Sequence, residues 1–398
     1  MAIALNVISG LSLIAWVYLL CRRGGFWRAD TFLSDNTPTP AIWPEVIAIV
    51  PARNEFELIG RAVSSLLKQN YPGPFAVILV DDHSSDNTAQ EAEEAANSTG
   101  RAGRLTIVRA GPLPPGWTGK IWALREGVAH SEEVAPGARY LWLTDADIEH
   151  ESGNLRHLVA KAEYEGFDLV SLMPMLPCSR FWERLLLPPF IFFFQKLYPF
   201  PRVNDPGRGD AAAAGGCMLL RAEALRRAGG MEPIRNELID DCALARQIKT
   251  QGRSGGGQIW LGLTRSARSI RPYSGFAGIW RMVARTAYTQ LGYSPLLLAG
   301  TVLGMLLTYL LPPLAALTFP WHGQTAAGLM GLFAWTLMAA AFRPTLLLYR
   351  QPFFFALLLP FAALLYTLMT IHSAIAHVLG QGGAWKDRPW KRFEEADK

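Results

Sequence analysis

The sequence Ala-Val-Ile-Leu-Val-Asp-Asp at residues 76–82 places two carboxylates directly after an apolar run of five residues. The sequence Tyr-Leu-Trp-Leu-Thr-Asp-Ala-Asp at residues 140–147 repeats this arrangement. Short apolar runs of this kind are typical of buried strands, and ligands of open α/β sheets bind just beyond the carboxyl ends of the strands. Carboxylates separated by one residue suit a divalent metal that holds a diphosphate. The two stretches predict an α/β fold with such a site at one edge of its sheet.

Around these stretches the chain alternates predicted strands and helices. Strands are expected at 46–50, 76–80, 105–109, 140–143 and 168–173. Helices are expected at 58–69, from the capping residue Asp86 to about 96, and at 121–130, and a further helix after residue 147 is expected to end at 166. The β-α-β-α-β order implies a mostly parallel, Rossmann-like sheet with helices on both faces.

Apolar residues are unevenly distributed along the chain. Half of the 398 residues are apolar and the mean hydropathy is +0.15. Residues 3–21 carry no charge, and residues 293–379 carry charges only at Arg343 and Arg350. Both regions are long enough to span a bilayer, whereas 44–275 has ordinary globular composition. The layout predicts a membrane-anchored enzyme.

The composition shifts divide the chain into six expected parts. These are an N-terminal transmembrane anchor (1–23), a linker (24–43), a catalytic domain (44–275), an interface helix (276–291), C-terminal transmembrane helices (292–380) and a basic tail (381–398). The aromatic segment 181–200 within the catalytic domain is expected to lie in the bilayer interface, and a buried core helix is the alternative.

Basic residues next to the apolar regions predict the orientation. Arg22 and Arg23 follow the first region, so the positive-inside rule places the globular domain in the cytoplasm. A signal peptide is disfavoured, because no basic residues precede the apolar run and no cleavage pattern ends it. Three C-terminal spans, at 294–318, 325–342 and 352–379, leave the C-terminus outside. The basic residues at 386–392 favour the inside, which leaves open that one span is re-entrant or interfacial.

Charge and cysteine content exclude two other classes of protein. The net charge is +5 and the isoelectric point about 9.0, but the basic residues are scattered or lie beside apolar spans, so a nucleic-acid partner is not expected. None of the four cysteines has metal-ligand or disulfide-framework spacing. A reducing compartment is therefore expected for the globular part.

Three motifs taken together resemble those of the family 2 glycosyltransferases. They are Pro-Ala-Arg-Asn-Glu at 51–55, Val-Asp-Asp-His-Ser-Ser-Asp at 80–86 and Asp-Ala-Asp at 145–147. Further motifs at 24–27, 116–120, 198–200, 214–219 and 239–244 resemble those of the hopene-associated glycosyltransferases of bacterial hopanoid gene clusters. The resemblance implies the GT-A fold and inversion at the anomeric carbon. The Gln-x-x-Arg-Trp motif of processive synthases does not occur, so a non-processive enzyme is expected.

The resemblance assigns a nucleotide-sugar site to the first two motifs. It implies that Asp81 and Asp82 contact the base and the ribose, and that Pro51, Ala52 and Glu55 line the same pocket. The remaining expected donor-binding residues are Arg53 and Lys120, both near phosphate, Gly215 and Gly216, which let the backbone approach the sugar, and, on a later helix, Arg281 and Arg285. For Arg53 a structural salt bridge is the alternative, and for Lys120 a solvated side chain.

The resemblance also assigns the metal and the general base. It implies that Asp145 and Asp147 bind Mg²⁺ or Mn²⁺, with Asp147 as the direct ligand. Asp241 aligns with the carboxylate that deprotonates the acceptor hydroxyl. Asp240 replaces the glutamate of the family's Glu-Asp pair and is expected to orient Asp241 or to raise its pKa. The alternative for this pair is a pair of acidic residues favoured by the helix dipole.

The expected reaction moves one sugar from a nucleotide-diphosphate donor, with uridine as the default base, to a lipid. The acceptor is expected to be a hopanoid or another polyisoprenoid at the cytoplasmic leaflet of the bacterial inner membrane. One alternative is a polyprenyl-phosphate acceptor, which needs no general base. The other is a non-catalytic membrane scaffold with a decayed transferase domain.

Overall fold

The computed structural model describes residues 2–34, 36–251, 257–380, 384–385 and 388–389, and it divides into two compact units. The first, here called the sheet unit, comprises Thr31–Pro177, Arg202–Pro272 and Ala384–Lys398. The second, here called the helical unit, comprises Met1–Asp30, Cys178–Pro201 and Tyr273–Gly383. The expected basic tail at 381–398 lies largely outside the described residues.

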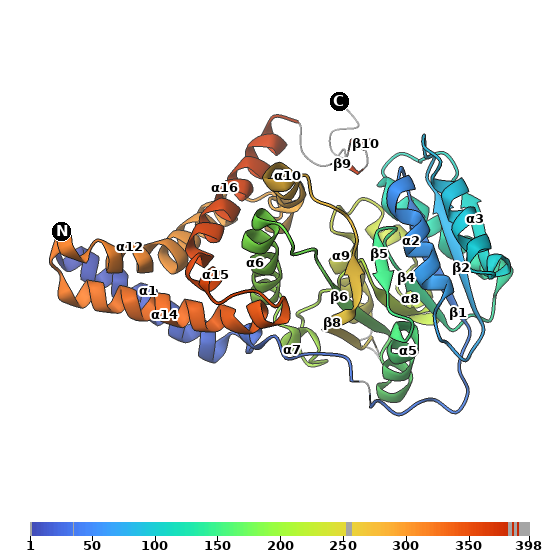
Figure 1. Ribbon diagram of the computed structural model, residues 1–398, viewed down its shortest axis with the longest axis horizontal. Coiled ribbons are helices and arrows are strands. Elements are labelled where there is room, and N and C mark those ends of the chain that lie inside the picture. The colour runs from blue at the N-terminus through green and yellow to red at the C-terminus, as the bar shows by residue number, and fades with distance from the viewer. Residues whose placement is uncertain (1, 35, 252–256, 381–383, 386–387, 390–398) are drawn as a thin grey trace. The chain divides into compact units, whose positions relative to one another are not determined.

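The sheet unit contains an eight-stranded sheet in the order β3-β2-β1-β4-β7-β6-β8-β5 (Figure 1). Its strands are β1 (Val46–Ala52), β2 (Phe75–Asp81), β3 (Leu105–Arg109), β4 (Tyr140–Leu143), β5 (Ile148–His150), β6 (Leu169–Met175), β7 (Met218–Arg221) and β8 (Ile259–Ser269). Its helices are α2 (Phe56–Leu67), α3 (Thr88–Ser98), α4 (Gly119–Val134), α5 (Asn154–Glu165), α8 (Ala222–Arg227) and α9 (Asp240–Gln251), with short 3₁₀ turns η2 (Ala102–Arg104) and η3 (Glu232–Ile234).

The register of the central strands brings the acidic motifs to one edge of the sheet. Strands β1 to β4 are parallel, with Ala52 beside Asp81 and Ile49 beside Leu143. The last residues of these strands therefore lie at the same edge, and the loops that follow them meet there.

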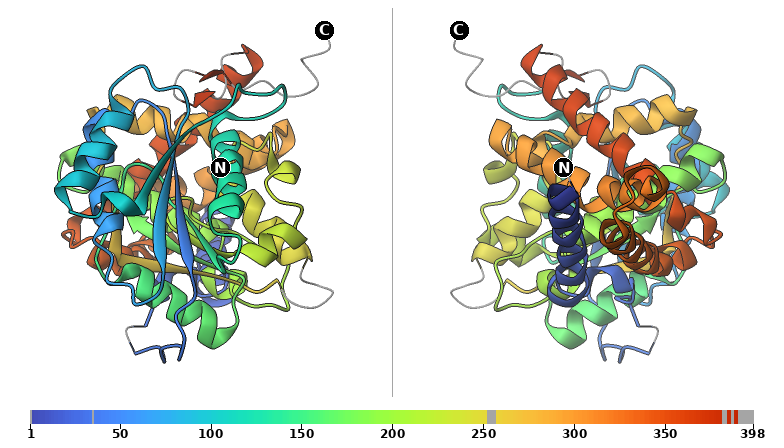
Figure 2. Two further views of the ribbon diagram at one scale, coloured as in Figure 1. Left: turned by 90° about the vertical axis from the view of Figure 1, so that its right-hand side faces the viewer. Right: turned by 90° about the vertical axis from the view of Figure 1, so that its left-hand side faces the viewer.

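The two faces of the sheet pack against different helices. On one face, alternate residues of β1 and β2, such as Ala48 and Leu79, form a buried core with residues of α2, α3 and α5. On the other face α4 approaches so closely that a Cβ added at Gly127 would lie 2.5 Å from Ile49 Cγ2 and 3.0 Å from Val80 Cγ2. Figure 2 shows helices on both sides of the sheet.

The expected α/β sheet with helices on both faces is confirmed, with three additional strands. Strand β7 pairs antiparallel with β4 and β6, β5 pairs antiparallel with β8, and β6 with β8 is parallel. The expected strand at 168–173 is β6, one residue displaced at its start. Strands β5 and β7 have only three and four residues, which is too short for a pattern of alternation to be visible in the sequence.

The helical unit contains helices and no strand among its described residues. Its main helices are α1 (Ala2–Arg22), α6 (Phe181–Leu197), α10 (Gly275–Thr286), α11 (Pro295–Met305), α12 (Leu311–Leu317), α14 (Thr325–Leu348) and α16 (Leu359–Val378). Short elements are η1 (Phe26–Arg28), η5 (Thr289–Leu291), the π-turn η6 (Leu306–Leu310), α13 (Phe319–His322) and α15 (Phe354–Leu357), and α7 (Phe200–Val203) crosses the boundary of the units.

Four helices are long and apolar enough to cross a membrane: Ala2–Arg22, Pro295–Leu317, Thr325–Leu348 and Leu359–Val378. They correspond to the four expected apolar regions. The third was expected to end at residue 342 but continues to Leu348, past Arg343 and Pro344, and the chain turns around Arg350, whose φ is 53°. Length and composition thus support a membrane-associated protein.

Prolines in the second candidate span determine how α1 packs on it. Pro312 has no N–H and cannot donate a helical hydrogen bond. The carbonyls of Thr308 and Leu307, four and five residues earlier, therefore receive no hydrogen bond from residue 312. Both accept side-chain donors from α1 instead: Ser12 Oγ lies 2.7 Å from the Leu307 oxygen and Trp16 Nε1 lies 2.6 Å from the Thr308 oxygen. The N-terminal helix therefore satisfies backbone groups that the prolines leave open.

Helices α6 and α10 pack inside the helical unit against α16. The Tyr366 hydroxyl donates to the Leu186 carbonyl (2.8 Å) in α6, the helix that contains Pro188 and Pro189. In α10, Ile279 and Val283 are buried, whereas Arg281 and Arg285 on another face are exposed. The segment 181–200, which was expected in the bilayer interface, thus contains a helix, α6, that packs on α10 and α16.

Candidate active site

The loops after β1 and β2 are joined through the backbone and through Arg53. The Arg53 guanidinium donates to the carbonyls of Asp82 (2.5 Å) and His83 (3.1 Å) and lies 4.0 Å from the Asp82 carboxylate. The Asp82 side chain is fully buried, and Asp81 Oδ1 accepts the Ser84 N–H at 3.0 Å. Arg53 therefore holds the two loops together. This contact corresponds to the alternative expected for Arg53, a structural salt bridge.

Asp86 caps the helices beside these loops. Its carboxylate accepts the N–H groups of Thr88 (3.0 Å) and Phe56 (3.2 Å), near the starts of α3 and α2. These hydrogen bonds lower the pKa of Asp86 against the opposing effect of partial burial. Pro51 and Ala52, also expected at the site, are buried at the end of β1. They border the same loop edge through their backbone.

Arg271 joins two of the expected site carboxylates from different loops. Its Nε lies 2.7 Å from Asp147 Oδ2, and a terminal nitrogen lies 2.6 Å from Glu55 Oε1. The side chains of Glu55 and Asp147 are only 7% and 14% exposed, so solvent screens these pairs weakly. Burial opposes the charge of Arg271, but the two carboxylates outweigh it and raise the pKa of the guanidinium.

Lys120 joins a second pair of expected site residues. Its Nζ lies 2.9 Å from Asp145 Oδ1 and 3.2 Å from Asp240 Oδ2. Lys120 occupies the first turn of α4, where the Thr118 hydroxyl caps the helix by accepting the Ile121 N–H. Burial alone lowers the pKa of Lys120, but Asp145 and Asp240 outweigh it and raise that pKa above its usual value. Lys120 is thus a charged part of the site and not a solvated side chain.

Asp241 is held by two backbone N–H groups. Its Oδ2 accepts the Gly215 N–H at 2.9 Å and its Oδ1 accepts the Cys242 N–H at 2.7 Å. It lies in the first turn of α9, where the helix dipole favours negative charge. Burial, with the adjacent Asp240 carboxylate, nevertheless raises the pKa of Asp241 to about 6. A carboxylate with that pKa can accept a proton near neutral pH.

Glycine lets the backbone come this close to the charged groups. A Cβ at Gly215 would lie 3.2 Å from Lys120 Nζ and 3.4 Å from Asp241 Oδ2. A Cβ at Gly216 would lie 2.8 Å from Pro174 Cγ, so this residue is required for packing. Gly215 therefore belongs with the expected site residues, whereas the structure gives Gly216 a role in packing.

The five carboxylates and two cations form one cluster. It contains Glu55, Asp145, Asp147, Asp240 and Asp241, with Lys120 and Arg271 between them. Three negative charges are not balanced inside the cluster when all five carboxylates are ionised. Burial raises the pKa of Asp147, and Arg271 offsets this only in part. The excess of negative charge on hard oxygen ligands fits a divalent cation.

Arg271 is a site residue that the sequence analysis did not identify. It follows the end of β8 by two residues, the position from which polar side chains reach the loop edge of the sheet. The strand at 259–269 was not expected, so this signal was not available. Arg281 and Arg285, which were expected, lie in the helical unit, where Arg281 donates to Ser274 Oγ at 3.1 Å. A role for these two arginines in donor binding stays a prediction.

No group of three His, Cys, Asp or Glu side chains close enough to hold a metal ion by themselves occurs in residues 2–34, 36–251 and 257–380. Mg²⁺, however, is usually held by one or two carboxylates together with substrate phosphates and water. Asp145 and Asp147 supply that number, and their surroundings retain uncompensated negative charge. The side chains present therefore fit a metal shared with a diphosphate.

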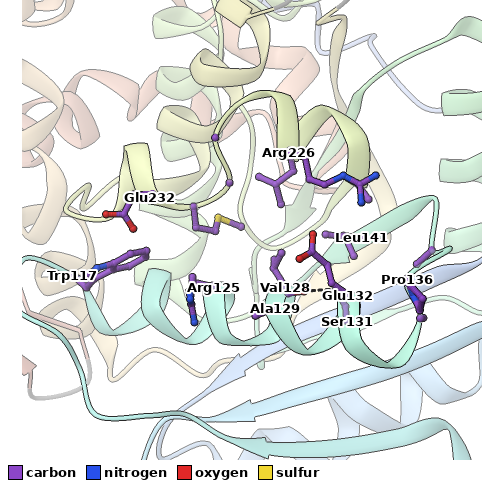
Figure 3. Close-up of a pocket in the computed structure, with 17 residues that line it drawn as sticks. Trp117, Arg125, Val128, Ala129, Ser131, Glu132, Pro136, Leu141, Arg226 and Glu232 are labelled. Carbon is purple, nitrogen blue, oxygen red and sulfur yellow. Dashed lines mark hydrogen bonds between the residues drawn. The ribbon is translucent and has the colours of Figure 1, made fainter.

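A pocket of about 330 Å³ lies along α4, away from this cluster (Figure 3). Trp117 and Glu232 lie at one end, and Pro136 at the other. Val128, Leu141 and other apolar side chains contribute to its lining. None of the carboxylates or cations of the cluster lines it, so the pocket is separate from the candidate site.

Comparisons with known proteins indicate the kind of protein to which the chain is similar. Residues 47–229 match the sequence profile of Glycosyl transferase family 2. A 4,4'-diaponeurosporenoate glycosyltransferase of Staphylococcus aureus is 27% identical over 206 residues, which is 51% of each chain. The chain thus spans about half the length of the curated relatives it matches. Residues 47–229, most of which belong to the sheet unit, are thus similar to glycosyltransferase family 2, and the matches support a glycosyltransferase.

The fold also resembles a solved structure along nearly its whole length. A mannosyltransferase from Pyrobaculum calidifontis, solved in complex with GDP-Man and Mn²⁺, aligns with a TM-score of 0.53 and 20% identity. The alignment covers 96% of this chain and 97% of the other. At this level of identity the likeness supports the fold alone.

Proposed function

We propose that this protein is an inverting, non-processive membrane glycosyltransferase. It moves one sugar from a nucleotide-diphosphate donor to the hydroxyl of a lipid, a hopanoid or another polyisoprenoid, at the cytoplasmic leaflet of the bacterial inner membrane. The observation that carries the proposal is the state of Asp241. This carboxylate is held by the Gly215 and Cys242 N–H groups beside a cation, and its pKa is raised to about 6.

The reaction is a single displacement at the anomeric carbon. The acceptor oxygen forms a bond to this carbon while Asp241 takes the hydroxyl proton, and the bond from the carbon to the diphosphate oxygen breaks. Because the acceptor oxygen attacks the face of the sugar opposite the departing diphosphate in this single displacement, the configuration at the anomeric carbon is inverted. Asp240 positions Lys120 through its 3.2 Å ion pair and keeps the Asp241 carboxylate basic through like-charge repulsion.

Negative charge grows on the departing nucleoside diphosphate. Lys120 and Arg271 are the cations of the cluster, and fixed positive charge in a partly dehydrated site stabilises such a leaving group. Asp145 and Asp147 would hold Mg²⁺ or Mn²⁺, which would supply further neutralisation of that charge. Asp81, at the end of β2, is proposed to accept a hydrogen bond from the base or ribose of a uridine donor. The Asp82 side chain is fully buried, so the same role for Asp82 would require its loop to move.

The acceptor class is supported by two separate facts. Four helices are apolar enough to span a membrane, so a lipid acceptor lies in the same phase as the protein. The curated relative in S. aureus is named for the glycosylation of diaponeurosporenoate. The name of that relative contains a polyisoprenoid acid, so these facts support an apolar polyisoprenoid as the acceptor class. The hydroxyl group of the proposed acceptor rests on the assignment of Asp241 as a general base.

Substitution of Asp241 by Asn tests the proposal. We expect transfer from UDP-sugar to a hopanoid or polyisoprenol hydroxyl to fall by about 10²–10⁴-fold, because the base is lost while size and shape are retained. Donor binding should change little. Since phosphate is already ionised, transfer to a polyprenyl phosphate would depend much less on Asp241. Retention of full activity by D241N would rule out the proposed role of this base.

A deletion strain identifies the acceptor. Lipid analysis of the strain should show loss of one glycolipid, which is restored by the wild-type chain and not by D241N. Restoration by D241N would instead indicate a phosphate acceptor or a non-catalytic scaffold.

A further inference from the structure

The two carboxylates proposed to hold the metal are both engaged by side chains of the chain itself. Asp147 lies 2.7 Å from Arg271, and Asp145 lies 2.9 Å from Lys120. Each cation has a second carboxylate, Glu55 for Arg271 and Asp240 for Lys120. A metal ion that binds here must therefore share or displace cations already in contact with its ligands.

The Arg271 contacts are the more restrictive of the two. They are the shorter pairs, and their carboxylates are at most 14% exposed, whereas the Asp145 side chain is 33% exposed. Arg271 also accounts for two separate attachments, to the loop after β1 and to the turn after β4. A free metal ion has no interaction to offer the guanidinium in return for Asp147.

A nucleotide diphosphate does offer such an interaction. The planar guanidinium fork matches phosphate oxygens as well as carboxylates, so Arg271 can exchange one anion for another without loss of charge pairing. The exchange leaves Asp147 available as an oxygen ligand at the moment when diphosphate oxygens arrive to complete the metal's coordination.

We propose that Arg271 is a positioning residue that excludes free divalent cations from Asp147 and releases this carboxylate when a nucleotide diphosphate binds. The metal and the nucleotide then bind together, each strengthening the binding of the other by the same factor. This inference rests on the proposed nucleotide-sugar site and specifies how that site is regulated.

The expected effect of removing Arg271 is opposite for the metal alone and for the metal with nucleotide. An opposite charge beside a carboxylate shifts its pKa by about one to three units. Removing the Arg271 charge should therefore strengthen the binding of another cation to Asp147 by about tenfold or more, because one pKa unit corresponds to a tenfold change in affinity. The affinity for nucleoside diphosphate should fall, because Arg271 no longer contacts the phosphates.

The test measures Mn²⁺ binding to the full-length protein in detergent by titration calorimetry at pH 8, with and without UDP or GDP. Arg271→Gln should bind Mn²⁺ alone about tenfold tighter than the wild type and lose most of the gain that nucleotide gives to the wild type. Arg268→Gln is the matched control, because Arg268 lies three residues before Arg271, near the end of β8, and pairs with Glu149 at 2.9 Å outside the cluster. Its Mn²⁺ affinity should equal that of the wild type.

Equal or weaker binding of Mn²⁺ alone by Arg271→Gln would overturn the inference. If this variant is not recovered folded, Arg271→Lys carries the test, since it keeps the charge but loses the two-pronged contact. It should bind Mn²⁺ alone with an affinity between those expected for the wild type and Arg271→Gln, and an unchanged affinity would contradict the proposal.

The proposed function fails separately. If the wild type binds no nucleoside diphosphate in the presence of Mn²⁺, the nucleotide-sugar site itself is wrong, and with it the release step. If nucleotide binds and Arg271→Gln leaves the affinity for Mn²⁺ alone unchanged, only the inference about Arg271 is wrong.

Discussion

The two compact units satisfy their polar groups in different ways. The helical unit contains two of the 33 acidic residues of the chain, Asp30 and Glu183, and ten of its 38 basic residues. In its candidate spans neutral donors of α1 bind backbone carbonyls, as from Ser12 and Trp16 to the proline-interrupted helix. A charged donor that reaches this helix, Lys196 Nζ, binds the Tyr309 hydroxyl at 3.1 Å and no carboxylate among the described residues. In the sheet unit, buried charges are paired with charges around Lys120 and Arg271.

The difference follows from what each surrounding allows. In lipid an open carbonyl is costly and an ionised partner more so, so uncharged indole and hydroxyl donors are suitable. In the sheet unit the carboxylates remain although hydrophobic residues would be cheaper to bury. Retaining a net negative cluster at a cost in stability indicates a site selected for chemistry.

The strongest test of this comparison removes one cation of the cluster. Lys120→Gln should lower the rate of sugar transfer by about 10²–10³-fold, because Asp145 and Asp240 lose their shared partner and the diphosphate loses a fixed positive charge. The measurement is kcat and KM for the donor. A change in KM alone would mean that Lys120 binds the donor without stabilising the leaving group.

The pH dependence should report the state of Asp241. Its pKa is raised to about 6, and the base acts only when ionised, so kcat/KM should fall about tenfold per pH unit below about pH 6 and level off above it. Lys120 opposes the upward shift, so Lys120→Gln should move the limb to higher pH. If the acidic part of the kcat/KM profile does not move in this variant, the charge of Lys120 does not influence the pKa of Asp241.

A smaller effect is expected in the helical unit. Trp16→Phe keeps an aromatic ring but removes the donor to the Thr308 carbonyl. The free energy of unfolding should fall by about 1 kcal/mol. Thermal unfolding in detergent should shift down by about 1 °C. Trp321→Phe is the matched control, since Trp321 is 82% exposed, and it should not shift the transition. Equal shifts in the two variants would contradict the role assigned to the α1 donors.

The smallest effect is expected for a charged group of the sheet unit outside the cluster. Glu149, two residues after Asp147, lies 2.9 Å from both Arg61 and Arg268, and these pairs are exposed. Glu149→Gln should change stability by less than about 1 kcal/mol and leave transfer activity unaltered. Loss of activity in this variant would show that any charge near Asp147 matters, and the contrast between cluster and surface would fail.

The sequence was sufficient for the elements whose pattern is local. Apolar runs that end in acidic residues predicted β2 and β4, and the four long apolar regions correspond to the four candidate spans. Strands β5 and β7 were not predicted, because, unlike the four apolar residues of β4, they are short segments that include charged residues, and their formation depends on partners far along the chain.

The same distinction applies to the site. Asp81 and Asp145 were identified because each stands at the end of an apolar run, and Asp241 was assigned from the resemblance to the family. Arg271 was not, because its place at the site depends on strand β8 bringing residue 271 next to residues 55 and 147.

The sequence by itself determined the α/β class, the separation of apolar and globular regions and the order of the acidic motifs, since all three depend on neighbouring residues. The tertiary structure decided which charges meet: that Lys120 joins Asp145 to Asp240, that Arg271 joins Asp147 to Glu55, and that glycine at 215 lets the backbone hold Asp241. The physical reason is that ion pairing acts over a few ångströms in space, and only the packed sheet brings residues more than 200 positions apart within that range.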